Sequence, residues 1–371
     1  MKQKQNKKMS RCQAPSPNSG IYLHIPFCRK KCAYCSFISQ KHDERIEERY
    51  FDVLCAEIRE REPLFERVGT IYLGGGTPSI VSLKSIEKTV YELKNRYDAL
   101  GIKEFTIELN PESVTKERIL FYKSLGIDRF SLGVQSIDDN VLRVLDRPHR
   151  RREVEEALGI FDEDDNLTID LIWGVTGHRQ NISFVDDYPI KHISTYMLTV
   201  EEKTPLFTKG YRVKNDAAIE KEYFMLLEEL YKRNFERYEV SNFAKKSYKS
   251  VHNSAYWDVD SVYTGYGVSA ASYDGKSRSQ NTDSIEDYIE SGGKLECVES
   301  IDDGRRIFEK IMLSMRTVNG IKLNQEIERH LNELKTLEYV KTGKLKLYDG
   351  NLSFTDAGFL IMNYILTDIE I

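Results

Sequence analysis

Three closely spaced cysteines, Cys28, Cys32 and Cys35, are the residues of this chain best suited to metal chemistry. Their CxxxCxxC spacing supplies three thiolates, one fewer than a closed four-thiolate zinc or iron–sulfur site uses. A [4Fe–4S] cluster held in this way leaves one iron open to a small-molecule ligand. The spacing therefore predicts a cluster that also serves as a reaction site, and a zinc site with a remote fourth ligand is the alternative.

Polar residues at the ends of predicted strands form a second group suited to chemistry. The glycines of Gly74–Pro78 favour a turn whose N–H groups form a nest for a carboxylate or phosphate, although a plain turn is the alternative. Glu108 alternates with apolar neighbours and is expected to face the interior of the fold. Further polar residues at similar depth favour a ligand cavity over a structural ion pair, namely Gln135, Arg147 and Asp170. For Arg147, a salt bridge at a helix end is the alternative to binding a ligand carboxylate.

The elements that must position these residues alternate between strand and helix. Six short β-branched runs, separated mostly by apolar stripes at helical spacing, predict parallel strands with crossover helices. These runs are Ile21–Phe27, Thr70–Leu73, Phe105–Leu109, Arg129–Val134, Thr168–Trp173 and His192–Leu198. Six units are fewer than the eight of a closed barrel, so we predict an α/β fold with an open, partial (β/α)6 barrel over residues 20–205.

The rest of the chain departs from this alternation. Short connections before and after Thr168–Trp173 predict trimmed helices in the fifth and sixth units. Residues 206–300 are interpreted as an aromatic, glycine-bearing extension that contains an HNxxYW-type segment. Residues 301–371 alternate helices with short strands, which indicates a small helical or winged-helix-like domain. Residues 1–19 are basic and polar, and we expect a disordered tail.

Composition narrows the class of protein. The chain has 371 residues and a net charge of −5, which suits one large and one smaller domain and argues against a nucleic-acid partner. No apolar run reaches the roughly 18 residues that span a bilayer, and no secretory signal follows the basic start. We therefore expect a cytoplasmic protein with no membrane anchor and no disulfide framework. Cys55 is interpreted as a core residue on a helix, and Cys297 as structural.

These motifs resemble those of the radical S-adenosylmethionine (SAM) enzymes, most closely the branch that contains the oxygen-independent coproporphyrinogen III dehydrogenases. The resemblance implies that SAM chelates the open iron of a [4Fe–4S] cluster and is cleaved to a 5′-deoxyadenosyl radical. It implies these cofactor contacts: Tyr22, Tyr34, Gly75, Gly76, Thr77, Glu108, Gln135, Arg147 and Asp170. The chain departs from the family pattern at Gly174–Arg179, next to Asp170.

Two features distinguish this chain from the dehydrogenases of the branch. The dehydrogenases carry a further cysteine where this chain has Phe37, and their N-terminal segment has no counterpart here. The segment His252–Trp257 is instead similar to that of the heme chaperones, which bind heme and pass it to hemoproteins. That resemblance implies heme as a further ligand, heme-accepting proteins such as respiratory enzymes as partners, and a homodimer.

The residues of this segment are compatible with heme. His252 offers an imidazole to iron, and Tyr256 and Trp257 offer apolar faces to a flat macrocycle. The alternative is an aromatic patch that packs against the open side of the barrel, with His252 hydrogen-bonded in place. The alternative functions are an oxygen-independent coproporphyrinogen III dehydrogenase and a non-catalytic iron–sulfur or zinc protein.

Overall fold

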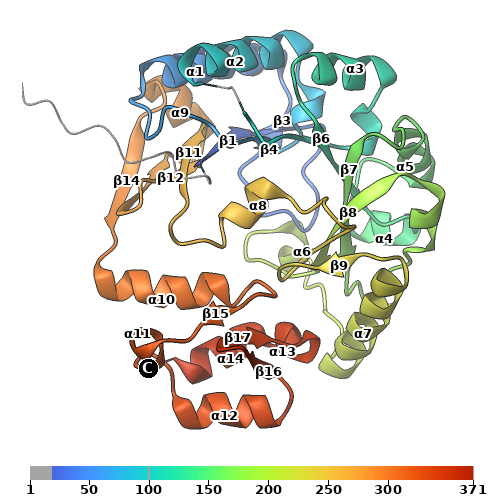
Figure 1. Cartoon of the computed structure of the whole chain (residues 1–371). Coiled ribbons are helices and arrows are strands. Elements are labelled where there is room, and N and C mark those ends of the chain that lie inside the picture. The colour runs from blue at the N-terminus through green and yellow to red at the C-terminus, as the bar shows by residue number, and fades with distance from the viewer. Residues whose placement is uncertain (1–18, 99–100, 371) are drawn as a thin grey trace, which may run out of the picture.

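The computed structural model describes residues 19–98 and 101–370. The expected tail as far as residue 18, with Cys12, lies outside these residues, as does the side chain of Cys297. The described residues form a 12-stranded sheet, a 3-stranded sheet and a small 2-stranded ladder. Figure 1 shows the large sheet curving beneath its helices, with the orange-to-red C-terminal unit beside it.

Six parallel strands form the centre of the large sheet, in chain order across the sheet. They are β1 (Ser19–Ile25), β4 (Thr70–Gly75), β5 (Glu104–Leu109), β6 (Arg129–Gln135), β7 (Asn166–Trp173) and β8 (Ile190–Met197). Each overlaps one of the six expected runs. The sheet ends at β14 on one edge and β9 on the other, so the barrel is open and the predicted partial (β/α)6 fold is confirmed.

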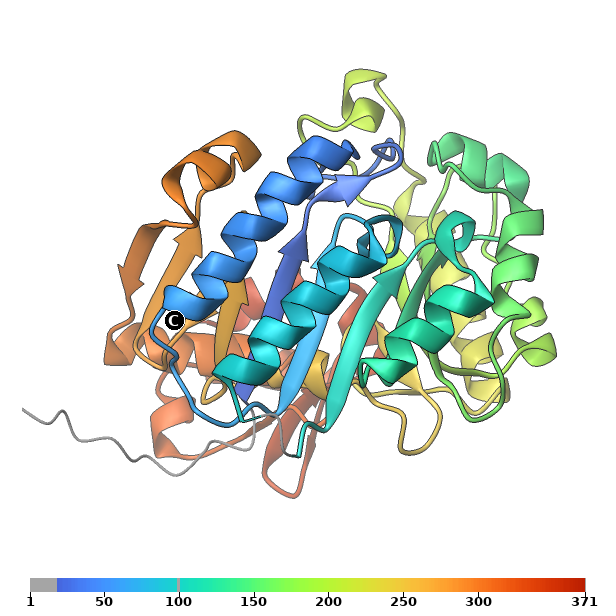
Figure 2. The same ribbon diagram turned by 90° about the horizontal axis from the view of Figure 1, so that it is seen from above.

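The first three crossover helices cover the outer face of the sheet (Figure 2). They are α1 (Glu44–Glu60), α2 (Leu83–Arg96) and α3 (Lys116–Ser124). Helix α1 begins where the Asp43 carboxylate accepts two backbone N–H groups, and its apolar stripe is buried at Tyr50, Leu54 and Ile58. Cys55 is fully buried on the same helix, which confirms its interpretation as a core residue.

The fifth and sixth units are shortened, as predicted. Two short helices, α4 (Asp139–Val144) and α5 (Arg151–Leu158), separate β6 from β7. Between β7 and β8 the chain forms only the 3-10 helix Ser183–Asp187.

Residues from the predicted extension lengthen the sheet at both ends. Strand β11 (Val262–Tyr266) pairs in parallel with β1, although more than two hundred residues separate them in sequence. Antiparallel strands β12 (Ala271–Tyr273), β13 (Ser277–Asn281) and β14 (Leu295–Ser300) follow. At the other end β10 (Asn242–Ala244) and β9 (Glu236–Arg237) pair next to β8. The helices of this region are α6 (Pro205–Thr208), α7 (Asp216–Lys232), α8 (Val251–Ala255) and α9 (Ile285–Ser291).

The C-terminal unit has its own hydrophobic core, which includes Ile311, Phe354 and Leu366. A three-stranded sheet of β15 (Ile321–Lys322), β17 (Asn351–Phe354) and β16 (Leu345–Tyr348) packs with helices. These are α10 (Asp303–Ser314), α11 (Gln325–Glu328), α12 (Glu333–Lys341), α13 (Asp356–Leu360) and α14 (Met362–Ile369). This composition fits the expected small helical or winged-helix-like unit. Across the described part of the chain, no helix is both long and apolar enough to cross a membrane.

Candidate active site in the partial barrel

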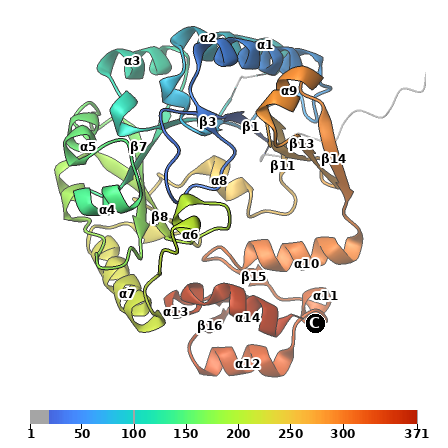
Figure 3. The same cartoon turned by 180° about the vertical axis from the view of Figure 1, so that it is seen from behind.

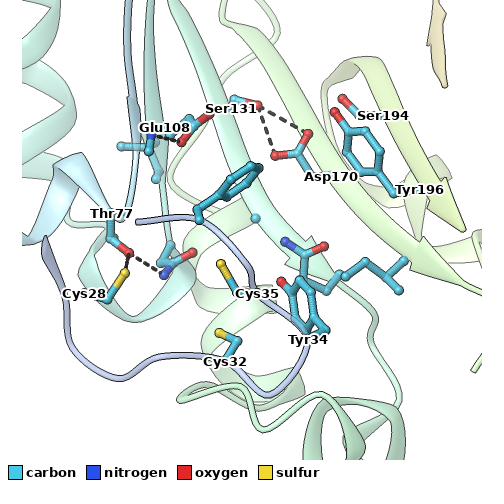
Figure 4. Close-up of a pocket in the computed structure, with 18 of the residues that line it drawn as sticks. Cys28, Cys32, Tyr34, Cys35, Thr77, Glu108, Ser131, Asp170, Ser194 and Tyr196 are labelled. Carbon is cyan, nitrogen blue, oxygen red and sulfur yellow. Dashed lines mark hydrogen bonds between the residues drawn. The ribbon is translucent and has the colours of Figure 1, made fainter. Parts of the chain in front are cut away.

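The carboxyl ends of the parallel strands and the cysteine loop enclose a cavity of about 490 Å³. Parallel β/α folds place ligands at this end of their strands. Eleven of the residues singled out in the sequence line it, namely Cys28, Cys32, Tyr34, Cys35, Gly75, Gly76, Thr77, Glu108, Gln135, Arg147 and Asp170. Figure 4 shows the three sulfur atoms in one half of the cavity and the Glu108 and Asp170 carboxylates in the other.

The cysteine loop is fastened at both ends and in its middle. Strand β2 (Phe27–Cys28) pairs with β3 (Gln40–Lys41), and this pairing closes the loop. Within the loop, Ala33 is buried, and its N–H donates to the Leu145 carbonyl at 3.0 Å. These bonds fix the backbone while the thiols remain directed at the cavity. Burial raises the pKa of the Cys28 and Cys35 thiols, so binding of a metal cluster by their thiolates releases protons.

The Gly74–Pro78 turn has no room for side chains. A Cβ at Gly75, where φ is +110°, would lie 2.6 Å from the His24 ring, and one at Gly76 would lie 2.6 Å from the Phe27 carbonyl oxygen. The N–H groups of Gly76 and Thr77 donate to the carbonyls of Ile25 and Phe27 at 2.8 and 2.7 Å.

The predicted anion nest at this turn is therefore wrong, because its donors are already used. The N–H of Gly75 donates to Glu108 Oε2 at 3.0 Å, and Gly74 pairs with His24 in the sheet. Tyr72 donates its hydroxyl to Oε1 of the same carboxylate at 2.8 Å. Burial raises the Glu108 pKa to about 7 against these two donors, and the nearby Asp170 adds to the rise. The turn thus presents an acceptor, which suits a ligand ammonium group.

Arg147 is a buried cation beside the sulfur atoms. It is 6% exposed, and its Nη1 donates to Cys32 Sγ at 3.2 Å and to the Tyr34 hydroxyl at 3.4 Å. Its Nη2 donates to Asn110 Oδ1 at 2.6 Å and to the Gly133 carbonyl at 2.9 Å. The alternative of a helix-terminal salt bridge is not what the structure shows. Nε of Arg147 is buried without a hydrogen-bond partner among the described residues, so the cation can still accept an anion.

Asp170 and Gln135 lie on the inner face of the barrel. Ser131 Oγ donates to both Asp170 oxygens at 3.3 and 3.4 Å, and burial raises the pKa of the carboxyl. Gln135 ends β6 with φ at +62°, and its carbonyl accepts Gln180 Nε2 at 3.0 Å. Both residues line the cavity.

The structure adds residues that the sequence reasoning missed. Arg129, Thr168 and His192 line the cavity, each no more than 3% exposed. Among the described residues, Arg129 Nη2, Thr168 Oγ1 and His192 Nδ1 are buried without hydrogen-bond partners. Buried polar atoms in this state require water or ligand atoms to bond with. Alternation with apolar neighbours along β6 and β7 was the available signal for Arg129 and Thr168, as it was for Glu108, whereas His192 follows Lys191 and had no such signal.

Asn253 of the HNxxYW-type segment lines this cavity, whereas Tyr22, His252, Tyr256 and Trp257 are not among the described residues that line it. Tyr22 points from β1 and hydrogen-bonds through its hydroxyl with His24 Nδ1 at 3.0 Å. Its ring stacks on Tyr72, whose hydroxyl holds Glu108. Trp257 is half-buried just beyond α8.

His252 is engaged on both ring nitrogens. Nδ1 lies 2.8 Å from Thr70 Oγ1, and Nε2 lies 3.1 Å from the Tyr256 hydroxyl. The ring stacks on Tyr72 with centroids 5.0 Å apart and is 2% exposed. Burial lowers the pKa of His252 to about 3, so the ring is neutral. In this arrangement both imidazole nitrogens are engaged, and the ring packs against Thr70 and Tyr72 of β4.

The residues that are present fit an iron–sulfur cluster with SAM. Three thiols surround one space, and the buried Arg147 guanidinium, which pairs with no carboxylate in the described part of the chain, balances the negative charge of thiolates or of a ligand carboxylate. Within residues 19–98 and 101–370, no group of three or more His, Cys, Asp or Glu side chains is arranged to hold a single metal ion.

Comparisons with known proteins agree with this geometry. The sequence model of the Radical SAM superfamily matches residues 22–180. Heme chaperone HemW of Buchnera aphidicola subsp. Schizaphis graminum is 35% identical over 68% of this chain and 70% of its own length. Heme chaperone HemW of Lactococcus lactis is 28% identical over 95% of this chain and 99% of its own length.

One solved structure supports the fold. The radical SAM enzyme coproporphyrinogen III oxidase (HemN) from Escherichia coli has a TM-score of 0.80 and covers 95% of this chain and 90% of its own. At 19% identity this likeness concerns the fold alone. The superfamily match and the 35% identity to a HemW protein show the family as well as the fold. The chain belongs to the HemW family of radical SAM proteins.

Proposed function

We propose that this chain is a heme chaperone that holds a [4Fe–4S] cluster and SAM in its barrel and transfers heme to hemoproteins. The observation that carries this proposal is the 35% identity to a HemW heme chaperone over 70% of that relative. The cavity supports this proposal, because the three thiols, residues of the Gly74–Pro78 turn and the buried Arg147 line one space.

The residues divide the work of binding. Cys28, Cys32 and Cys35 hold the cluster, and Arg147 compensates its charge from the Cys32 side. Glu108 receives the amino group of SAM, and the tight turn at Gly75 fixes that carboxylate by donating an N–H to it. When bound, the cluster and SAM supply one-electron chemistry. Asp170 and Gln135 line the space left for the rest of the cofactor.

Heme-accepting proteins, respiratory enzymes among them, are the partners that this function requires, and we place the chain in the cytoplasm. We also propose that two copies of the chain form a homodimer. Tyr34 lines the cavity beside the cysteines and is proposed to contact SAM, and Tyr22 is proposed to contribute to the same site. Tyr22 acts indirectly, since its ring packs against the Tyr72 that holds Glu108.

The test is anaerobic reconstitution of the full chain with iron and sulfide, followed by two assays on the same sample. We expect a cluster absorbance that a Cys32→Ala variant lacks, and a Soret shift when heme is titrated. We expect no turnover when coproporphyrinogen III, SAM and a reductant are added. Formation of protoporphyrinogen IX would overturn the chaperone assignment, and a colourless, zinc-containing preparation would overturn the cluster.

A further inference from the structure

The part of the barrel cavity nearest the amino ends of the strands is not used by the cluster or by SAM in the proposed function. Here Thr168 of β7 pairs with His192 of β8, and two residues further along Asp170 pairs with Ser194. Two residues of a strand span about 6–7 Å, so Thr168 and His192 lie that much farther from the carboxyl ends than Asp170 does. Arg129, at the start of β6, and the start of α8 complete this region, which we call the cavity floor. Figure 3 shows α8 on the concave side of the large sheet.

Three side chains of the cavity floor each carry a polar atom that lacks a partner. These atoms are Arg129 Nη2, Thr168 Oγ1 and His192 Nδ1, buried without hydrogen bonds to other described residues. The side chains come from three neighbouring strands, and all three line the cavity. Buried polar atoms in folded proteins are almost always bonded, so the cavity floor requires water or ligand atoms.

The unpartnered nitrogen of His192 is a donor. Burial, together with the nearby Arg129 charge, lowers the pKa of His192 well below its usual value, so the ring is neutral and carries one proton. The Tyr238 hydroxyl accepts the Ser250 N–H at 3.2 Å and lies 2.8 Å from His192 Nε2. In the described chain Nε2 is the acceptor available to the hydroxyl proton, so Tyr238 donates to it and the imidazole proton is on Nδ1.

Arg129 retains charge that its ion pair does not use. Its Nη1 donates to Asn166 Oδ1 and to the Tyr248 carbonyl, both at 3.2 Å, and Glu104 Oε2 lies 3.6 Å away. The Glu104 carboxylate accepts three shorter hydrogen bonds, of 2.8 to 3.0 Å, from groups at the start of α8. Arg129 Nη2 therefore presents positive charge to the cavity, and no anion among the described residues is bonded to it.

We infer that the cavity floor binds the carboxylate group of a small molecule, with Arg129 Nη2, His192 Nδ1 and Thr168 Oγ1 as its donors. Three donors, one of them charged, match the acceptor oxygens of a carboxylate. One guanidinium balances the single charge of this group, whereas a phosphate dianion would remain partly unbalanced. SAM does not supply the carboxylate in the proposed arrangement, because Glu108 receives its amino group near the carboxyl end of β5.

The experiment is equilibrium dialysis of radiolabelled propionate against the full-length, anaerobically reconstituted chain, with SAM at saturation. We expect propionate to bind and the neutral amide, propionamide, to compete at least about tenfold less well. Thr168→Val keeps the volume of the side chain and removes the hydroxyl, so it should weaken propionate binding about tenfold, as expected for a hydrogen bond to a charged group. Thr264→Val is the matched control and should bind as wild type, since Thr264 is fully buried in β11 and is not among the described residues that line the cavity.

Two variants of His192 separate ligand binding from a structural role. His192→Gln retains a group at the position of Nε2, next to Tyr238, but has no donor at the position of Nδ1. His192→Asn has a donor at the position of Nδ1 and loses the contact with Tyr238. We expect His192→Asn to bind propionate several-fold more tightly than His192→Gln. A purely structural role predicts the reverse order, because His192→Gln keeps the contact within the protein.

Two sources can bring the carboxylate to the cavity floor, a free small acid or heme, which has two propionate side chains. Heme that displaces labelled propionate while its dimethyl ester does not would identify heme as the source, and any other pattern would identify a free acid. Wild-type protein that binds no propionate, or binds it unchanged after Thr168→Val, would overturn the site and leave the cavity floor to water. Neither result affects the proposed heme function, which the Soret titration tests separately.

Discussion

At the scale of single residues, burial raises the pKa values of the carboxyl groups in the site and so influences whether they are charged. Glu108 and Asp170 face one cavity, and burial raises the pKa of both, but only the Glu108 carboxylate receives a backbone N–H and a tyrosine hydroxyl at 3.0 Å or less. With a pKa of about 7, Glu108 changes charge near neutrality. That places a titrating group at the proposed site of the SAM ammonium.

SAM binding should therefore strengthen as pH rises through 7. Only the ionised Glu108 carboxylate attracts an ammonium, and a group with a pKa of about 7 is roughly 10% ionised at pH 6 and 90% at pH 8. We expect about a tenfold fall in the SAM dissociation constant over this range, measured by calorimetry on reconstituted protein. Glu108→Gln should bind weakly at both pH values with a flat profile. A slope that persists in this variant would show that another group titrates.

At the scale of elements, the Gly74–Pro78 turn at the end of β4 shows how backbone hydrogen bonds position a ligand-binding carboxylate. Three of its donors are spent on the protein itself, which makes the turn rigid and directs Glu108 rather than an N–H group at the ligand. Two features require glycine at position 75: its φ is positive, and the His24 ring leaves no room for a Cβ.

Gly75→Ala should lower the free energy of unfolding by more than an ordinary glycine substitution. Gly177 provides the control, because its φ of +80° is also left-handed but nothing lies within 4 Å of a Cβ placed there. We expect about 1 kcal/mol for Gly177→Ala, from backbone strain alone. For Gly75→Ala we expect a further loss of about 1–3 kcal/mol from overpacking against His24, measured by denaturant unfolding. Equal losses in the two variants would contradict the role assigned to the His24 contact.

At the scale of the whole molecule, one side chain joins the barrel to the C-terminal unit. Arg237 is buried, with its guanidinium 4.6 Å from the centre of the Phe243 ring and 4.8 Å from that of Phe359, which belong to the two separate cores. It also donates to the Tyr223 hydroxyl at 2.8 Å and pairs with Asp356 at 3.2 Å. These contacts couple the folding of the two units.

Arg237→Met should uncouple them. Loss of the buried hydrogen bonds and of the cation–π contacts removes about 2–4 kcal/mol that acts across the junction. We expect wild-type protein to unfold in one calorimetric transition and Arg237→Met to unfold in two, with the C-terminal unit melting first. Arg212→Met, at an exposed position, should keep a single transition. One transition at an unchanged temperature in Arg237→Met would show that the coupling lies elsewhere.

Much of the barrel was predictable from the sequence because its signals are local. The first of the apolar stripes expected between the strands became α1, and the alternation around Glu108 placed that carboxylate inside the barrel. Strand β11 escaped prediction because it pairs with β1 across a large sequence separation and lies outside the strand–helix alternation. No periodic pattern encodes such a partner.

The sequence by itself determined the chemistry that depends on covalent spacing: three cysteines in one loop and a glycine turn after a strand, at the same end of a parallel sheet. Only the tertiary structure decided which polar atoms remain free. Whether His252 offers a free nitrogen depends on the hydroxyl groups of Thr70 and Tyr256, which lie against the two nitrogens of its ring. Burial and hydrogen bonding sum over the neighbours of a group in space, and the distant ones are fixed only when the chain has folded.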